Sequence, residues 1–276
     1  EEMMRQEVLP LLRAESGIVG RSPQAPIVRH VFHTFGLAEA DVDAKLTGLI
    51  PTGAPVELGL LASPMGVLVS LTTKGNQSAH VTHPDLVEML ANGVRLRLSD
   101  WLFAEGRDTM EEIVGRELTK QGLMLAVAES CTGGLIGHRL TQVAGSSAYM
   151  DRGAVCYSNR AKTEMLGIPP KLIAQHGAVS KEVAAAMACG IRERANVSVG
   201  LSVTGIAGPG GGTETKPVGL VYIGLDDGTG RPIAQEFRFH GDRNVIKQRS
   251  SQAALDLLRR WLLNNTNGRD LREKRD

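Results

Sequence analysis

Apolar and polar positions along the chain predict a short helix followed by a small unit of mixed elements. Residues 2–13 carry apolar side chains at a helical spacing, and residues 16–26 are rich in Gly, Ser and Pro, which is typical of a linker. From Ile27 the pattern predicts a β-α-β-β-α unit. Its expected elements are a strand at 27–35, a helix at 39–49, strands at 56–61 and 67–73, and a helix at 84–102. Gly106 and Arg107 end this unit, which is too compact to hold a deep site.

The rest of the chain alternates between strand-like and helix-like segments. Asp108 to Glu111 can cap the first helix of this part, which Gln121 and Gly122 close. The expected strands cover 123–128, 153–157, 197–204, 219–225 and 233–240, and the later helices cover 135–143, 161–166, 181–195 and 244–263. The alternation predicts an α/β fold, a mixed and mainly parallel sheet flanked by helices, with a smaller α+β domain before it.

These patterns divide the chain into four parts. We expect a terminal helix and linker at 1–25, an α+β domain at 26–106, an α/β domain at 107–264, and a polar tail at 265–276 that frays. Because Glu1 begins a helical segment, we also expect the chain to have been cut from a longer protein.

Composition narrows the classes of partner. The chain has Lys+Arg 31 and Asp+Glu 30, so it lacks a broad electrostatic footprint for nucleic acid or membrane, and any anionic ligand must be held locally. Its three cysteines form no C-x-x-C pair, which is typical of a reducing compartment. No apolar run reaches the ~18 residues of a membrane helix. We expect a cytoplasmic protein.

The strongest local signal is the polar turn from Glu129 to Gly134, between a predicted strand and a helix. Ser130 offers a hydroxyl nucleophile, and the small residues after it can open backbone N–H groups toward a ligand as an oxyanion hole or anion nest. Gly133 and Gly134 allow a close approach of the backbone to a substrate. The alternative is an ordinary helix cap made by Ser130 or Thr132.

A second cluster, from Tyr157 to Lys162, follows another predicted strand and supplies candidates for the base that a serine needs. A lysine desolvated in a pocket has a lowered pKa and can take the serine proton, while a tyrosine can relay or orient that proton. In the alternative interpretation, Lys162 lies on the surface and Tyr157 in the core.

A third cluster, from Thr204 to Gly212, is glycine-rich and again follows an apolar strand. Small residues let backbone N–H groups reach a phosphate or ribose, although the pattern is neither a Walker A loop nor a dinucleotide fingerprint. We expect a phosphate group of the ligand to bind at this loop together with Arg243, which begins the last helix. Lys216 is the alternative cation for binding that phosphate. A plain flexible loop is the other interpretation. The residues expected to contact substrate are Thr132, Gly133, Gly134, Asn159, Thr204, Gly205, Ala207, Gly208, Pro209, Gly210, Lys216 and Arg243.

Other candidate sites are weaker. His80 and His83 lack a third ligand, so we expect no metal. Cys131 could itself be a nucleophile, but His138 should lie about two turns along the following helix, too far away to act as its base. Ser130 is therefore preferred.

Six ordered motifs resemble the CinA family, named for competence and DNA damage, and specifically its C-terminal nicotinamide-nucleotide amidase domain of the PncC type. They are AESCTGG (128–134), YSNRAK (157–162), QHGAVS (175–180), TGIAGPGGG (204–212), KPVG (216–219) and HGDR (240–243). The resemblance implies hydrolysis of nicotinamide mononucleotide to nicotinate mononucleotide and ammonia, without metal or cofactor. It also implies that Ser130 is the nucleophile, Lys162 the base and Tyr157 the relay.

The same resemblance suggests identities for the other parts. Residues 26–106 resemble the family's KH-like middle domain, and residues 1–15 resemble the last helix of an otherwise missing molybdopterin-binding-like domain. Because no G-x-x-G loop joins two helices, binding of RNA or DNA is not expected. The expected partners are a small-molecule nucleotide and a second copy of the chain in a homodimer.

Two other functions fit the same residues. An amidase for another small amide would keep the Ser130 and Lys162 chemistry without needing a phosphate cradle. A catalytically idle nucleotide-binding module in DNA damage or competence would bind nicotinamide mononucleotide without releasing ammonia.

Overall fold

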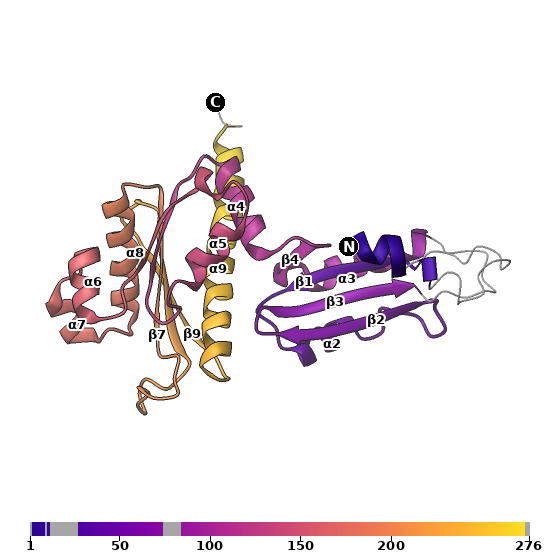
Figure 1. The fold of residues 1–276 in the computed structure, drawn as a ribbon, viewed down its shortest axis with the longest axis horizontal. Coiled ribbons are helices and arrows are strands. Elements are labelled where there is room, and N and C mark those ends of the chain that lie inside the picture. Colours follow the sequence, from indigo (N-terminus) through magenta and orange to yellow (C-terminus); the bar gives the residue numbers. More distant parts are fainter. Residues whose placement is uncertain (1, 9, 12–26, 74–83, 274–276) are drawn as a thin grey trace.

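The computed structural model describes residues 2–8, 10–11, 27–73 and 84–273, in two lobes with one sheet each (Figure 1). Near the N-terminus a π-helix covers Met4–Val8, where a helix is predicted. The predicted linker at 16–26, together with His80 and His83, lies outside the described residues. None of the helices in the described ranges is long and apolar enough to cross a membrane.

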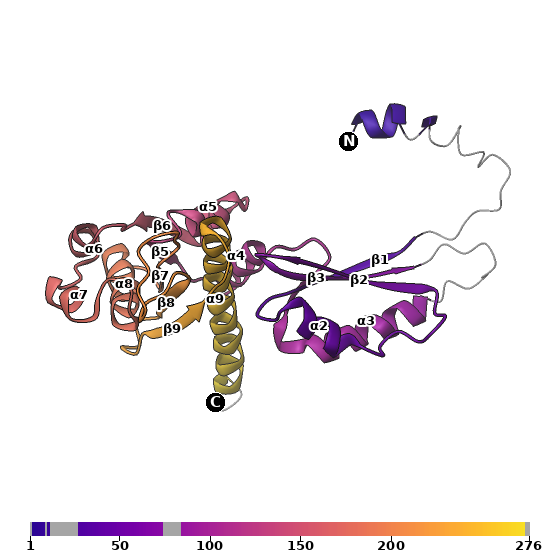
Figure 2. The ribbon, with the colours of Figure 1, turned by 90° about the horizontal axis from the view of Figure 1, so that it is seen from below.

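The smaller lobe is an antiparallel sheet backed by two helices (Figure 2). Its strands are β1 (Arg29–Thr34), β2 (Val56–Ser63), β3 (Gly66–Thr73) and β4 (Leu102–Glu105), in the order β2-β3-β1-β4. The helices are α2 (Glu39–Leu46) and α3 (Pro84–Leu98). Phe32 and Val69, on the covered face of the sheet, share one fully buried core with Val42 of α2 and Val94 of α3.

The strand β4 corrects the prediction of a helix over 84–102. The helix α3 ends at Leu98, a 3-10 turn covers Ser99–Trp101, and β4 pairs antiparallel with β1. Around this pairing Phe35 N–H donates to Trp101 O at 2.9 Å, and Gly106 N–H donates to Val31 O at 2.8 Å. The open edge of β1 thus supplies backbone partners, and such a long-range contact overrides the local helical periodicity.

The larger lobe contains a five-stranded mixed sheet in the order β6-β5-β7-β8-β9. Its strands are β5 (Leu125–Glu129), β6 (Met150–Val155), β7 (Val199–Gly205), β8 (Leu220–Asp226) and β9 (Ile233–Arg238). The strand β5 is parallel to β6 and β7, whereas β8 is antiparallel to β7 and β9. The predicted α/β class is confirmed. Parallel pairing is limited to the strands that helices connect, because loops alone join β7 to β8 and β8 to β9.

Helices cover both faces of this sheet (Figure 1). One face carries α6 (Asn159–Leu166), α7 (Pro170–His176) and α8 (Lys181–Ala195), and the other carries α4 (Met110–Lys120), α5 (Leu135–Gln142) and α9 (Arg243–Glu273). Side chains of a strand alternate between faces. Leu125 and Val127 of β5 therefore enter the core with α4 and α9, while Ala126 and Ala128 enter the core with α8.

Two helices of the larger lobe differ from the prediction. No helix is predicted at 170–176, where α7 forms with Pro170 in its first turn, a position at which the fixed backbone of proline favours a helix. The predicted polar tail from 265 is instead helical as far as Glu273.

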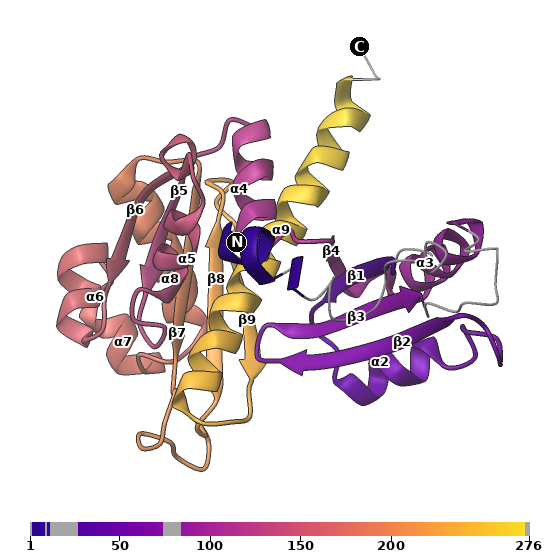
Figure 3. The ribbon, with the colours of Figure 1, turned by 45° about the vertical axis from the view of Figure 1, so that its right-hand side comes forward.

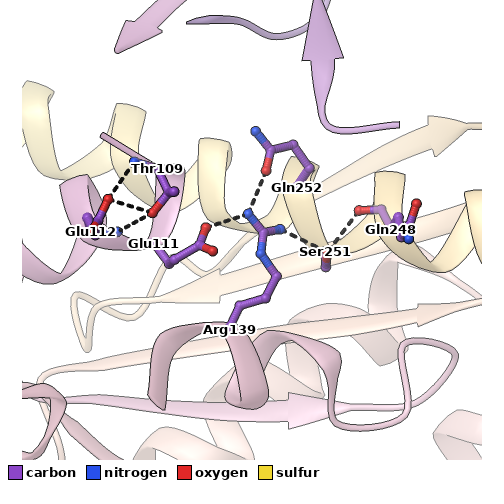
Figure 4. A network of polar contacts seen from close by, with 7 residues as sticks. All are labelled: Thr109, Glu111, Glu112, Arg139, Gln248, Ser251 and Gln252. Atoms are coloured by element: carbon purple, nitrogen blue, oxygen red, sulfur yellow. Dashed lines mark hydrogen bonds and ion pairs between the residues drawn. The ribbon is translucent and has the colours of Figure 1, made fainter. Parts of the chain in front are cut away.

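A buried arginine joins α4, α5 and α9 (Figure 4). Arg139 of α5 donates to Glu111 at 2.7 Å, to Ser251 Oγ at 2.9 Å and to Gln252 at 2.7 Å. These charge-assisted hydrogen bonds hold α9 against α5. The helix α9 also lies beside the smaller lobe (Figure 3), where Arg260 donates to Asp100 O at 2.8 Å.

We predict that Arg139→Ala lowers the free energy of unfolding by about 3–5 kcal/mol, because it leaves Glu111 and Gln252 without their buried partner. Urea unfolding monitored by circular dichroism measures this loss. Arg116→Ala is the matched control, since Arg116 pairs with Asp108 on the exposed part of the same helix layer and should lose at most about 1 kcal/mol. Equal losses in the two variants would contradict a stabilising role for the buried network.

Candidate active site

Ser130 lies at the carboxyl end of β5, where the chain leaves the sheet. Its N–H donates to Val203 O of β7 at 3.0 Å, which fixes the start of the turn. Gly133 and Gly134 then lead into α5 with φ angles of 65° and 96°. A side chain at either position would be strained in this left-handed backbone conformation, so the glycines allow the sharp turn after Ser130.

Glu129, to which no role is assigned from the sequence, holds this turn in place. Its buried carboxylate accepts hydrogen bonds from the N–H groups of Gly134 at 3.0 Å, Ile136 at 3.1 Å and Gly137 at 2.8 Å. These N–H groups belong to the start of α5 and have no partner within the helix, and the helix dipole further stabilises the negative charge. A carboxylate directly before a glycine-rich helix start is the signal that could have revealed this function.

Lys162 reaches Ser130 from α6. Ser158 caps this helix by accepting from Ala161 N–H at 3.0 Å, and Lys162 lies on the buried face of the first turn. Lys162 Nζ is 3.0 Å from Ser130 Oγ, 2.9 Å from Cys156 O and 3.3 Å from Tyr157 O. Only 1% of Lys162 is exposed. Burial lowers the pKa of Lys162 from its ordinary value of 10.5, because the charged form loses its water.

The three contacts of Lys162 match the hydrogen-bonding capacity of a neutral amine. An ammonium would donate to all three oxygens, whereas the neutral amine that the lowered pKa favours would donate to the carbonyls of Cys156 and Tyr157 and accept the O–H of Ser130 through its lone pair. No carboxylate of the described residues forms an ion pair with Lys162 Nζ. The geometry and the lowered pKa together suit Lys162 to accept a proton from Ser130.

The Tyr157 hydroxyl contacts Arg243 and not Ser130. Arg243 donates to Tyr157 Oη at 3.0 Å and to Gly208 O at 2.7 Å. Tyr157 is 60% exposed as a residue, and its backbone carbonyl is the group that reaches Lys162. The structure therefore does not bring the Tyr157 hydroxyl into the position expected of a proton relay. Tyr157 and Arg243 instead join the glycine loop to the segment after β6.

The backbone N–H groups after Ser130 differ in their availability. Gly133 N–H donates to Ser130 O at 3.1 Å, and Gly134 N–H is bound by Glu129. The N–H groups of Cys131 and Thr132 bind no oxygen atom within the described chain, and they contact the Cys131 thiol. Among the N–H groups after Ser130, those of Cys131 and Thr132 are therefore the ones that no oxygen of the described chain occupies.

Cys131 is a poor alternative nucleophile. Burial raises the pKa of its thiol to about 12, so the reactive thiolate is scarce at neutral pH. The hydroxyl of Ser130, by contrast, lies within hydrogen-bonding distance of the Lys162 amine, with 3.0 Å between Oγ and Nζ. The local environment favours the serine of this neighbouring pair.

The glycine loop is fastened to the segment before α8. Thr204 Oγ1 donates to Ala178 O at 2.8 Å, and Lys216 Nζ donates to His176 O and Val179 O at 2.7 Å each. Thr204 and Lys216, which are both expected to contact substrate, therefore donate hydrogen bonds to backbone carbonyls of residues 176–179. Their placement gives the loop a defined position beside β7.

The other predicted substrate contacts are spread over different surroundings. Gly205 ends β7 and Ala207 is buried, whereas Pro209 and Gly210 are exposed. Asn159 lines a separate hollow of about 430 Å³ together with Pro170, Ile173 and other residues of α6 and α7. The structure thus brings Ser130 and Lys162 together directly, and it places Asn159 toward a different surface.

Two family models match the chain. The CinA C-terminal domain matches residues 107–262, and the damage-inducible protein CinA KH domain matches residues 29–104. A CinA-like protein from Citrifermentans bemidjiense is 46% identical over 95% of this chain and 60% of its own length. A CinA-like protein from Syntrophus aciditrophicus is 42% identical over 94% of this chain and 60% of its own length. The chain thus spans about 60% of the length of these curated relatives.

Solved structures agree with these matches. The competence/damage inducible protein CihA from Agrobacterium tumefaciens is 43% identical, with a TM-score of 0.52 over 54% of this chain and 93% of that chain. A competence-damaged protein (CinA) superfamily protein from Klebsiella pneumoniae is 31% identical, with a TM-score of 0.54 over 57% of this chain and 99% of that chain.

The buried amine leads to a prediction about stability and pH. The unfolded chain keeps Lys162 protonated up to its ordinary pKa of 10.5, while the folded chain releases that proton at a lower pH because burial lowers the pKa. Between the two values the unfolded state binds more protons, so the free energy of unfolding rises with pH. Lys162→Met removes this contribution. We predict that wild type gains stability relative to Lys162→Met as pH rises toward 10.5.

Urea unfolding of both proteins at a series of pH values measures the difference. The control is Lys120→Met, which changes an exposed lysine at the end of α4. It should shift the free energy of unfolding by an amount that varies little with pH. A difference between wild type and Lys162→Met that stays constant up to pH 10.5 would contradict the lowered pKa.

Proposed function

The chain belongs to the CinA family, and we propose that its C-terminal domain is an amidohydrolase that converts nicotinamide mononucleotide to nicotinate mononucleotide and ammonia. The observation that carries the proposal is the buried contact of 3.0 Å between Lys162 Nζ and Ser130 Oγ. A base within hydrogen-bonding distance of a serine hydroxyl is the arrangement that nucleophilic acyl transfer requires. The choice of nicotinamide mononucleotide as the substrate rests on the resemblance of the sequence motifs to the amidase domain.

In the proposed first step, Ser130 Oγ attacks the carboxamide carbon of the substrate and its proton passes to Lys162 Nζ. The carbonyl π-electrons move to oxygen and form a tetrahedral oxyanion. The positive charge of the pyridinium ring makes the carboxamide carbon more electrophilic. Lys162 then returns its proton to the leaving nitrogen, the C–N bond breaks, and ammonia leaves an acyl ester on Ser130.

The N–H groups of Cys131 and Thr132 are the proposed donors to the oxyanion. They bind no oxygen of the described chain, so an oxyanion would replace only their contact with the Cys131 thiol, which is a weak acceptor. One such donor contributes about 2.7–4 kcal/mol to transition-state stabilisation in a serine hydrolase. The carboxylate of Glu129 supports them indirectly, because it fixes the start of α5 directly after the turn.

In the second step, a water molecule attacks the ester and gives its proton to Lys162. The acid is released and Ser130 recovers its hydroxyl proton from Lys162. In this mechanism four residues act by positioning, because their contacts organise the loops around the reacting pair: Tyr157, Arg243, Thr204 and Lys216.

We further propose that the protein is a cytoplasmic homodimer and that its activity needs no metal or cofactor. Gel filtration tests the dimer, and activity in a chelator tests the absence of a metal requirement.

We predict that Ser130→Ala abolishes ammonia release from nicotinamide mononucleotide while the free energy of unfolding changes by only about 1 kcal/mol, the scale of one hydrogen bond. Ammonia release coupled to glutamate dehydrogenase measures turnover, and mass spectrometry of the product distinguishes nicotinate mononucleotide from other products. Cys131→Ala is the control and should keep most of the activity. Full activity in Ser130→Ala, or its loss in Cys131→Ala alone, would overturn the choice of nucleophile.

We predict that Lys162→Arg is almost inactive although it keeps a positive charge, because a guanidinium does not lose a proton near neutral pH. In wild type, kcat/KM should rise with pH through an ionisation below the ordinary lysine pKa of 10.5, since the neutral amine is the active form. An active Lys162→Arg variant with an unchanged pH profile would exclude Lys162 as the base.

A further inference from the structure

A second lysine, Lys247, lies beside the turn that follows Ser130. A Cβ atom placed on Gly133 would be 3.6 Å from Lys247 Nζ. Lys247 belongs to α9, one helical turn after Arg243 and one turn before Ser251, which binds Arg139 of α5. Residues four apart share one face of a helix. The contact of Ser251 with α5 thus explains why Lys247 faces the same side.

Lys247 differs from the other cations of the site in having no partner among the described residues. Its Nζ forms neither a hydrogen bond nor an ion pair with any residue that the structure describes. Arg243 is bound to Gly208 O and Tyr157 Oη, and Lys216 is bound to two backbone carbonyls. A half-buried ammonium beside a catalytic turn, without an acceptor of its own, can bind an anion without breaking an internal contact.

The start of α9, at which the sequence suggests a phosphate beside Arg243, is already occupied. The Asp242 carboxylate accepts from Val245 N–H at 2.9 Å and so caps the helix with a negative charge. A phosphate at the same place would meet that carboxylate. One turn further along, Lys247 is separated from this cap and lies against Gly133, which carries no side chain to cover it.

A polar group of the same turn, one residue before Gly133, also lacks a partner within the described chain. Thr132 Oγ1 is fully buried and forms no hydrogen bond within the described chain. Buried hydroxyl groups are nearly always hydrogen-bonded in folded proteins. Thr132 directly precedes Gly133 in the turn, so the unpaired hydroxyl belongs to the residue next to the one that Lys247 approaches.

We propose that Lys247 is the cation that binds the phosphate of the mononucleotide substrate, with the Ser130–Gly134 turn between that phosphate and the reacting carboxamide. This inference rests on the proposed function for the identity of the substrate. A residue of α9 would then distinguish a nucleotide from a nucleoside. This helix packs on the face of the sheet opposite to α6, which carries Lys162.

The test compares Lys247→Met, which removes the charge and keeps an unbranched apolar chain, with Lys247→Arg, which keeps the charge. Steady-state kinetics are measured on nicotinamide mononucleotide and on the phosphate-free nicotinamide riboside. Lys247→Met should raise KM for the mononucleotide about 10- to 100-fold, the scale of a lost charged hydrogen bond, with kcat within about threefold. Lys247→Arg should recover most of the loss, and the kinetics on the riboside should not change.

Lys120→Met is the matched control, because Lys120 ends α4 shortly before β5 begins, whereas Ser130 follows the other end of that strand. It should behave as wild type on both substrates. An equal loss of kcat/KM on mononucleotide and riboside in Lys247→Met would overturn the proposal, and so would an unchanged KM for the mononucleotide.

Calorimetric binding of the mononucleotide separates this inference from the proposed function. It is measured in Ser130→Ala with and without Lys247→Met, so that no turnover is needed. If wild type releases no ammonia, the proposed function fails, but a 10- to 100-fold loss of affinity in the double variant would still support Lys247 as the phosphate ligand. Equal affinity in the two backgrounds would overturn it.

Discussion

The burial of the Lys162 amine is the constraint on which the site depends. An ammonium group removed from water must find hydrogen-bond acceptors or lose its proton. The backbone supplies two carbonyls, those of Cys156 and Tyr157, because β6 ends at Val155 and α6 begins only at Asn159. The short connection between strand and helix therefore accepts two hydrogen bonds from Lys162 Nζ and leaves the third side of that nitrogen facing Ser130 Oγ.

The helices on the two faces of the larger sheet contribute different side chains to the carboxyl end of β5. Lys162 comes from the layer of α6, α7 and α8, whereas the residues around Gly133 are supported by α5 and α9. Ser130 stands between them because β5 is the strand with parallel neighbours on both sides. The carboxyl ends of parallel strands are where α/β proteins place ligands, since the loops that follow can converge there.

Much of this arrangement could be predicted from the sequence, because strand ends carry the informative residues. The positions of Ser130 and Lys162 after strands follow from apolar runs that end in polar turns, whereas the sequence left the burial of that lysine open and only the packing of α6 decides it. The strand β4 was missed because its pairing with β1 is a long-range contact, and Glu129 because its partners are backbone N–H groups that carry no sequence identity. Lys247 escaped notice for a similar reason. It lies more than a hundred residues from Gly133, and only the packing of α9 on α5 brings the two together.

The length of α9 has a consequence for the relation between the two lobes. Lys247 lies near its start, beside the catalytic turn, and Arg260 lies thirteen residues later, bound to Asp100 O of the smaller lobe. At 1.5 Å per residue the two contacts are about 20 Å apart on a single rigid rod. The helix therefore fixes the distance between the junction of the lobes and the turn after Ser130. An insertion or deletion of one residue between Lys247 and Arg260 would rotate one contact by about 100° relative to the other.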